Sequence, residues 1–299
     1  MTLEELIRAW FLMDEDLSGC LCTYAEEPAV FLHSAPSDTQ QGWKPEGQYP
    51  RIVFVTDMEA DTERKSQGTL RVGIYCDLAG SPVPEDLEPL VRASLRDVLM
   101  KPEGGNPFCF AWRRTDPFEM EGQEGDKRIG GYEVSFDILE YPAQPIGLPD
   151  PVLSMGQAMK RIFWQPVIIP YEMEGDYYRT TDERPAVYVR AESISRDHDI
   201  YAVSWMLCRL RIHVIAPTAE ARSLWIGSIV SWLSRHGEII LNDGHPMLIR
   251  SIEAENGIDY LQTGQVMCEG TYAIVSARVD NGKVTETLNH ADFSSADGG

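Results

Sequence analysis

The stretch Leu70-Arg71-Val72-Gly73-Ile74-Tyr75-Cys76-Asp77 alternates apolar residues with polar or small ones. This period of two predicts a strand with one buried face. Residues 206–215 repeat the alternation, with Cys208, Leu210 and Ile212 on the apolar side. Each stretch is followed by a segment with helical spacing of apolar residues, 84–100 in the first half and 218–234 in the second. The two halves of the chain therefore share a local order.

Other landmarks extend this order at a nearly constant distance. Short strand-like runs precede the alternating stretches, and pairs of predicted strands follow the helices. The early runs cover 52–55 and 186–189, and the later strands cover 108–113 and 131–139, then 246–252 and 265–275. Pro50 and Pro185 are 135 residues apart, Pro84 and Thr218 are 134 apart, and Gly131 and Gly264 are 133 apart. A collinear pattern of this kind predicts an internal repeat.

The repeat predicts an α+β fold with two similar domains, each a mainly antiparallel sheet of about four strands covered by an amphipathic helix. We expect the first domain over residues 1–144 and the second over 145–280. Prolines crowd residues 141–150, which indicates a semi-rigid linker. Residues 281–299 have no core-forming pattern and are expected to be a disordered tail.

The segments that lead into each repeat are less regular. Residues 3–13 have helical spacing, with Thr2 as the expected N-cap and Glu5 completing a capping box. Residues 152–164 are the expected counterpart of this helix. The stretch 14–48 has little periodicity and is interpreted as a long, partly extended loop, which is a candidate for contact with a neighbouring molecule.

The charge of the chain is strongly acidic. The 299 residues contain 47 Asp and Glu against 26 Lys and Arg, a formal charge of −21. Such a surface repels phosphate and gives no electrostatic basis for nucleic-acid affinity. It either keeps the protein soluble or lines a surface past which a polyanion moves without binding.

Cysteine usage and hydropathy point to folding in a reducing cytoplasm. Four of the six cysteines stand singly within apolar strand-like runs, where a free thiol is a small buried apolar group. The first residues lack the pattern of a secretory signal, and no apolar run reaches the roughly 20 residues that span a bilayer. No membrane association is therefore expected.

The sequence lacks the common motifs of nucleotide binding and hydrolysis. GxxxxGK[ST], HExxH, GxSxG and a GxGxxG after a strand are all absent. Asp14, Asp16, Ser18 and Gly19 begin like a calcium loop, but its twelfth position is Ala25, so an acidic turn is favoured. Cys20 and Cys22 have no second Cys or His pair at zinc spacing. We predict no catalytic, cofactor-binding or metal-binding residue.

The remaining polar candidates have structural interpretations. We expect His213 to lie in a strand and His236 at a helix end, and we expect Asp243 with His245 to form a hairpin turn. The remaining expectations are a solvated loop containing Asp57, Glu59, Asp61 and Glu63, and solvated side chains for Arg92 and Arg96.

The order of elements resembles the tail-terminator and minor tail (head–tail joining) proteins of long-tailed phages and related particles. The stretches that carry this resemblance are 50–54, 67–75, 84–100 and 132–138, then 185–189, 207–214 and 219–233. The resemblance is architectural and covers residues 1 to about 277. This chain departs from the family in being tandemly duplicated, because the usual member has one domain.

The resemblance implies a homo-oligomeric ring that caps the tail tube, stops its polymerisation and joins it to the neck. Its partners would be other copies of itself, the tail-tube protein and a neck or connector protein, with DNA only as transiting cargo. Six copies would give twelve domains, and three copies would give a pseudo-sixfold ring. The protein would be assembled in the host cytoplasm and located in the virion. Two alternatives stay open: a tail-tube or baseplate component, and an enzyme with its site between the duplicated halves.

Overall fold

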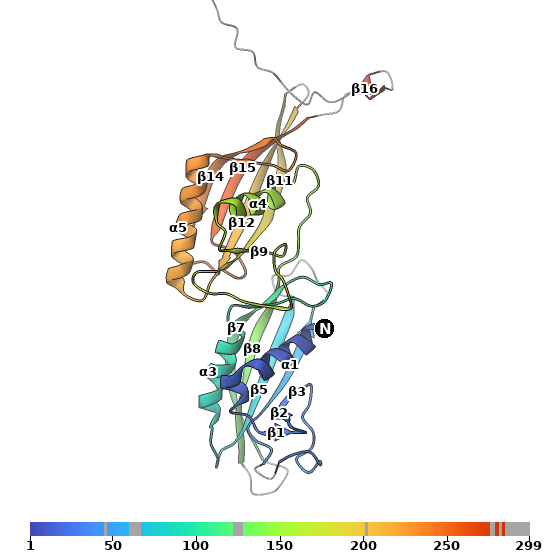
Figure 1. Ribbon diagram of the computed structural model, residues 1–299, viewed down its shortest axis with the longest axis vertical. Helices are drawn as coiled ribbons and strands as arrows, with labels where there is room; N and C mark the ends of the chain where they lie inside the picture. Colours follow the sequence, from blue (N-terminus) through green and yellow to red (C-terminus); the bar gives the residue numbers. More distant parts are fainter. Residues whose placement is uncertain are drawn as a thin grey trace, which may run out of the picture.

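Two main sheets lie end to end along the long axis of the molecule in the computed structural model (Figure 1). The structure describes residues 1–44, 47–59, 67–121, 128–200, 203–275, 279–280 and 283–284. The sheets are mainly antiparallel and are covered by a few helices, which confirms the α+β class. The expectation of about four strands in each was wrong. The sheets have seven and six strands, because short edge strands without a recognisable sequence period extend both.

The first sheet contains long central strands flanked by short ones. Its strands are β3 (Val30–Leu32), β4 (Arg51–Met58), β5 (Gly68–Asp77), β6 (Val98–Met100), β7 (Phe108–Glu121), β8 (Arg128–Glu140) and β10 (Tyr177–Arg179). They are ordered β10-β6-β7-β8-β5-β4-β3. Since β10 comes from the second half of the sequence, the first sheet contains three residues that lie beyond the expected domain boundary.

The second sheet repeats the same arrangement. Its strands are β9 (Val167–Ile169), β11 (Ala186–Ile200), β12 (Val203–Ile215), β13 (Glu238–Ile240), β14 (Pro246–Ala254) and β15 (Val266–Val275), ordered β13-β14-β15-β12-β11-β9. This matches β6-β7-β8-β5-β4-β3 strand for strand, and in each of the two sheets the strand that comes first in the chain, β3 or β9, pairs in parallel with its neighbour. The repeat seen in the sequence is therefore a repeat of topology.

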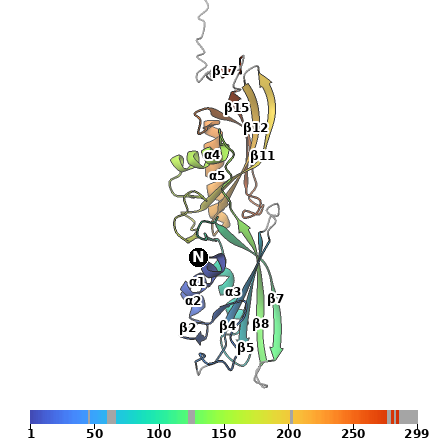
Figure 2. The same ribbon diagram turned by 90° about the vertical axis from the view of Figure 1, so that its right-hand side faces the viewer.

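All four long helices lie on one side of the two sheets (Figure 2). They are α1 (Leu3–Met13), α3 (Pro84–Leu95), α4 (Pro151–Ile162) and α5 (Ala219–His236). Leu6, Phe11 and Val91 belong to the core under the first pair, and Met155 and Ile229 to the core under the second. In Figure 2 the opposite faces, where β7, β8, β11 and β12 are labelled, carry no helix from the described residues.

The start of α1 follows the sequence prediction. Glu5 N–H donates to Thr2 Oγ1 at 3.2 Å, and Thr2 N–H donates to Glu5 Oε2 at 2.9 Å, which completes the capping box. The end of α3 does not follow it, because the helix stops at Leu95 instead of continuing to residue 100. Asp97 has a left-handed backbone (φ +55°), and the next three residues form β6.

The segment 14–48 is more ordered than a single extended loop. It contains the short helix α2 (Glu15–Ser18) and the two-stranded ribbon of β1 (Thr23–Tyr24) and β2 (Glu27–Pro28), followed by β3. Leu17 and Val30 are fully buried, so part of the segment belongs to the core. The tail predicted from residue 281 lies outside the described residues, except for β17 (Lys283–Val284), which pairs with β16 (Val279–Asp280).

Candidate functional site

The junction between the halves is built around β10 and the edge of β6. Tyr177 lies opposite Met100 and Arg179 opposite Val98 in an antiparallel pairing. The ladder is extended at one end by Lys101 N–H, which donates to Asp176 O at 2.8 Å. The second half thus adds a strand to the first sheet, which is recognition through backbone hydrogen bonds.

Side chains of the same segment contact α1 and α3 of the first half. The Tyr177 hydroxyl donates to Leu6 O in α1 at 2.9 Å, and its ring packs on Trp10 with centroids 5.2 Å apart. Arg179 donates to Ala93 O in the last turn of α3 at 3.3 Å. A cation is favoured there because the last carbonyls of a helix are unpaired and carry the negative end of its dipole.

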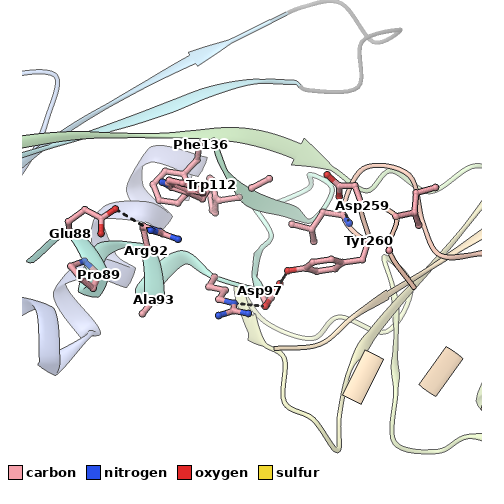
Figure 3. Close-up of a pocket in the computed structure, with 15 residues that line it drawn as sticks. Glu88, Pro89, Arg92, Ala93, Asp97, Trp112, Phe136, Asp259 and Tyr260 are labelled. Atoms are coloured by element: carbon pink, nitrogen blue, oxygen red, sulfur yellow. Dashed lines mark hydrogen bonds and ion pairs between the residues drawn. The ribbon is translucent and has the colours of Figure 1, made fainter. Parts of the chain in front are cut away.

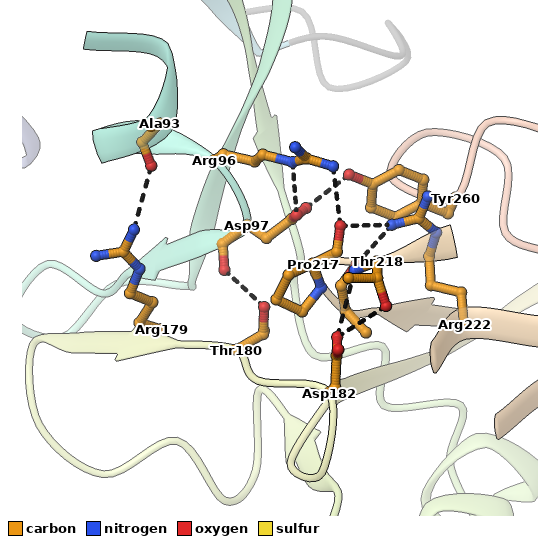
Figure 4. Close-up of polar contacts among 11 residues, drawn as sticks. Ala93, Arg96, Asp97, Arg179, Thr180, Asp182, Pro217, Thr218, Arg222 and Tyr260 are labelled. Carbon is orange, nitrogen blue, oxygen red and sulfur yellow. Dashed lines mark hydrogen bonds and ion pairs between the residues drawn. The ribbon is translucent and has the colours of Figure 1, made fainter. Parts of the chain in front are cut away.

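Asp97 is the buried acid at this junction (Figure 4). Its Oδ1 accepts a 2.6 Å hydrogen bond from the Tyr260 hydroxyl, and its Oδ2 lies 3.4 Å from Arg96 Nε. Burial raises the pKa of the Asp97 carboxyl, while the Tyr260 hydrogen bond and the charges of Arg96 and Arg222 oppose the shift. Burial also raises the pKa of the Tyr260 hydroxyl, with the nearby Asp97 charge adding to the effect.

Arg96 and Arg92 were expected to be solvated, and both are exposed. Each also has specific contacts with the protein. Arg96 donates to Pro217 O, just before α5, at 2.8 Å and so links the halves. The Arg92 guanidinium lies 4.0 Å from the centre of the Trp112 ring and 3.5 Å from Glu88. The sequence thus predicted the exposure of the two arginines, and the structure adds their partners.

An apolar cluster and a neutral histidine complete the junction. Tyr141 packs against Tyr188 and donates its hydroxyl to Leu261 O at 3.1 Å. His213 is buried, with Arg190 Nε 3.2 Å from its Nε2 and Tyr260 O 3.0 Å from its Nδ1. Since arginine can only donate and a carbonyl can only accept, this arrangement fixes the neutral Nδ1–H tautomer. Burial first, and then the charge of Arg190, lowers the pKa of His213 to about 4.

A groove of about 870 Å³ runs between α3, β7 and the β14–β15 connection (Figure 3). This is where an enzyme with its site between the halves would place its chemistry. The carboxylates drawn there already have protein partners. Glu88 accepts from Thr115 at 2.8 Å, Asp97 accepts from Tyr260, and Asp259 Oδ1 accepts the backbone N–H groups of Leu261 and Gln262, both at 2.9 Å. Of these contacts the Asp97–Tyr260 bond crosses the junction, whereas those of Glu88 and Asp259 stay within their own halves.

The structure does not bring the weak metal candidates together. Asp14 caps α2 by accepting from Leu17 N–H at 3.3 Å, and Ala25 adopts a positive φ of 46° in the β1–β2 turn. Cys20 and Cys22 are free thiols, and burial raises the pKa of Cys22 to about 12. Among the described residues no group of three or more His, Cys, Asp or Glu side chains could hold a metal ion.

The other candidate residues also take structural positions. His213 lies in β12, and His236 donates from Nδ1 to Trp232 O at the end of α5, as predicted. Asp243 and His245 lie in the β13–β14 turn, where Gly244 has a φ of +89°. The acidic residues Asp57, Glu59, Asp61 and Glu63 were predicted to form a solvated loop. Asp57 lies instead within β4, and Glu59 directly follows this strand. Asp61 and Glu63 lie outside the described residues.

No family model matches the chain, and a search of curated proteins found no match either. Within the described part of the chain, no helix combines the length and apolar character needed to cross a membrane. The candidate site therefore rests on the junction geometry. The sequence analysis did not find its main residues, which are Asp97, Tyr177 and Tyr260. Hydrophobic periodicity cannot reveal a strand of only three residues or an isolated acid.

Proposed function

We propose that the protein is a structural component of a phage tail or tail-like particle that forms a ring at the end of the tail tube, as a tail terminator or head–tail joining protein. The observation that carries the proposal is the contact between the halves, which joins unlike surfaces of two similar units. The resemblance in element order supplies the biological setting.

The junction is heterologous in the sense used for oligomers. The first half contributes the C-terminal end of α3 and the edge of β6. The second half contributes residues that precede α5 and the connections that follow β9 and β14. Head-to-tail contacts between similar units close into rings when the rotation permits and otherwise give open filaments. One chain already contains one such contact, and the corresponding outer ends of its two halves are left for neighbouring copies.

The charge of the chain supports passage of DNA through such a ring. An excess of 21 acidic over basic side chains repels phosphate, so DNA could cross the ring as cargo without being retained. The tail-tube protein and a neck or connector protein are the proposed partners. We propose that the protein is assembled in the host cytoplasm and located in the virion.

Negative-stain electron microscopy and mass photometry of the purified chain test this function. We expect rings of one size, either six copies with twelve domains or three copies with pseudo-sixfold symmetry. Added to purified tail tubes, these rings should be found at the tube ends. Open tubes of indefinite length would favour the tail-tube or baseplate alternative. A compact monomer of 33.6 kDa at all concentrations tested would contradict both.

A further inference from the structure

We infer that the free edge of β13 binds the β3–β4 connection of a second copy of this chain as an added antiparallel strand. This inference rests on the proposed ring and names the contact by which successive chains would join. Its basis is that the same contact already exists once within the chain, between equivalent elements of the two halves.

The equivalence follows from the sheet orders. β6 and β13 are the matching strands of the two sheets, and among the described strands β6 has a further neighbour, β10, whereas β13 ends its sheet. β10 is part of the connection between β9 and β11, residues 170–185. In the first half the matching connection joins β3 to β4, residues 33–50. An edge like that of β6 and a segment like that of β10 therefore remain at the two outer ends of the molecule.

The backbone of β13 is oriented to accept a strand. Ile249 N–H donates to Gly237 O, and Leu241 N–H donates to His245 O, both at 2.8 Å. Hydrogen-bonding directions alternate along an antiparallel strand, so the backbone groups of Glu238 and Ile240 face away from β14. Ile239 pairs with Met247 as Met100 pairs with Phe108, which makes Ile240 the counterpart of Lys101. Lys101 N–H is the donor to Asp176 in the existing junction.

Spacing identifies the segment that would be added. β10 begins nine residues before β11 (186 − 177), and Gly42 stands nine residues before β4 (51 − 42). Gly42-Trp43-Lys44 thus corresponds to Tyr177-Tyr178-Arg179, and an aromatic residue precedes a basic one in both. Lys44 would reach the last turn of α5 as Arg179 reaches that of α3.

The position of this segment within its own half is compatible with strand addition. Ala25 N–H donates to Gly42 O at 2.9 Å, and the Trp43 ring packs on Tyr24 with centroids 4.8 Å apart. Trp43 forms an antiparallel bridge with Tyr24 beside this hydrogen bond, which directs the Trp43 N–H and C=O away from β1. Gly42 has a φ of +128°, so the segment has to extend at this glycine when it adds to β13. Trp43 is the residue that would then pair with the edge. Its counterpart Tyr178 lies opposite Leu99, and Leu99 corresponds to Glu238.

A proline at the edge tests the contact. Ile240→Pro removes the outward N–H while leaving the β13–β14 bonds intact, and proline is tolerated on edge strands of this kind. Ile240→Thr is the matched control, because it also removes the exposed apolar side chain but keeps the N–H. With circular dichroism confirming that both variants fold, mass photometry should show loss of the ring for Ile240→Pro and retention for Ile240→Thr. A ring that survives Ile240→Pro, or is lost equally in both variants, would overturn the inference.

A cysteine pair tests the register. Gln41 corresponds to Asp176 and would lie opposite Ile240 of the next copy, at the Cα separation of about 5.5 Å that suits a disulfide. The variant Gln41→Cys with Ile240→Cys should give a reducible ladder of linked chains under mild oxidation, and each single variant and the wild type should not. If the wild type forms rings, the cysteine pair gives no linked ladder and Ile240→Pro leaves the rings unchanged, the strand contact is wrong and the ring function stands. A monomeric wild type contradicts both.

Discussion

The Tyr260 hydroxyl donates a 2.6 Å hydrogen bond to Asp97 Oδ1 across a separation of 163 residues. It connects the turn between α3 and β6 with the β14–β15 connection of the other half. Asp97 is almost fully buried, and its other carboxylate oxygen lies 3.4 Å from Arg96 Nε. A hydrogen bond to a buried carboxylate holds two surfaces together more strongly than an exposed ion pair does, because water cannot replace the missing partner.

We expect Tyr260→Phe to lower the free energy of unfolding by about 2 kcal/mol, since it leaves the Asp97 carboxylate without its strongest donor. Asp97→Asn should cost less, about 1 kcal/mol, because the amide oxygen can still accept from Tyr260. Urea unfolding of both variants and of the double variant gives the coupling energy. A coupling below about 0.5 kcal/mol would show that the pair does not hold the halves together.

His213 should make the junction sensitive to acid. Its pKa is about 4 in the folded protein, against 6.5 for the ordinary side chain. Between these values the unfolded chain binds more protons, so stability is fully present above pH 6.5 and is lost as the pH falls toward 4. The loss amounts to about 3 kcal/mol at most, from the free-energy equivalent of one pKa unit.

The measurement is the free energy of unfolding from pH 4 to pH 7.5 for the wild type and His213→Gln. The variant should be less stable at pH 7.5 and should show a flatter profile. Asp97 acts in the opposite direction, because its raised pKa means that its contribution is lost as the pH rises. Asp97→Asn is therefore the control: it should keep the pH dependence of stability that comes from His213 and remove the part that comes from Asp97. An unchanged slope in His213→Gln would assign the acid sensitivity to another group.

The long strands and helices could be predicted because burial imposes a period on their sequences. Alternation in β5 and β12 and helical spacing in α1 and α5 reproduce the observed elements within a few residues. The match between the halves followed from the same patterns. The order of strands within each sheet did not, since it depends on long-range pairing.

The end of α3 shows why the rest could not be predicted. Val98 and Leu99 continue an apolar helical pattern, yet they form β6 because β7 and β10 pair with that strand on its two sides. Strands of three residues have too few positions to show a period. The junction is harder still, because Asp97 and Tyr260 become meaningful only when two distant segments meet.

Adding a Cβ at two glycines, one closely packed and one exposed, tests how tightly the strands of the first sheet are packed. Gly131 lies in β8, and a Cβ added there would overlap Ile74 O of the neighbouring strand and the Phe118 ring. The carbonyl cannot move without breaking the β5–β8 ladder, so Gly131→Ala should lower the free energy of unfolding by about 3 kcal/mol, the upper part of the range for overpacking.

Gly227 gives the matched control in the middle of α5. It is exposed, and a Cβ added there meets no atom within 4 Å. Gly227→Ala should therefore raise the free energy of unfolding by about 1 kcal/mol through helix propensity alone. Thermal and urea unfolding of the two variants should thus shift in opposite directions. If Gly131→Ala is as stable as the wild type, β5 and β8 are not as close at this point as the structure has them, and the bare face of the first sheet is packed differently.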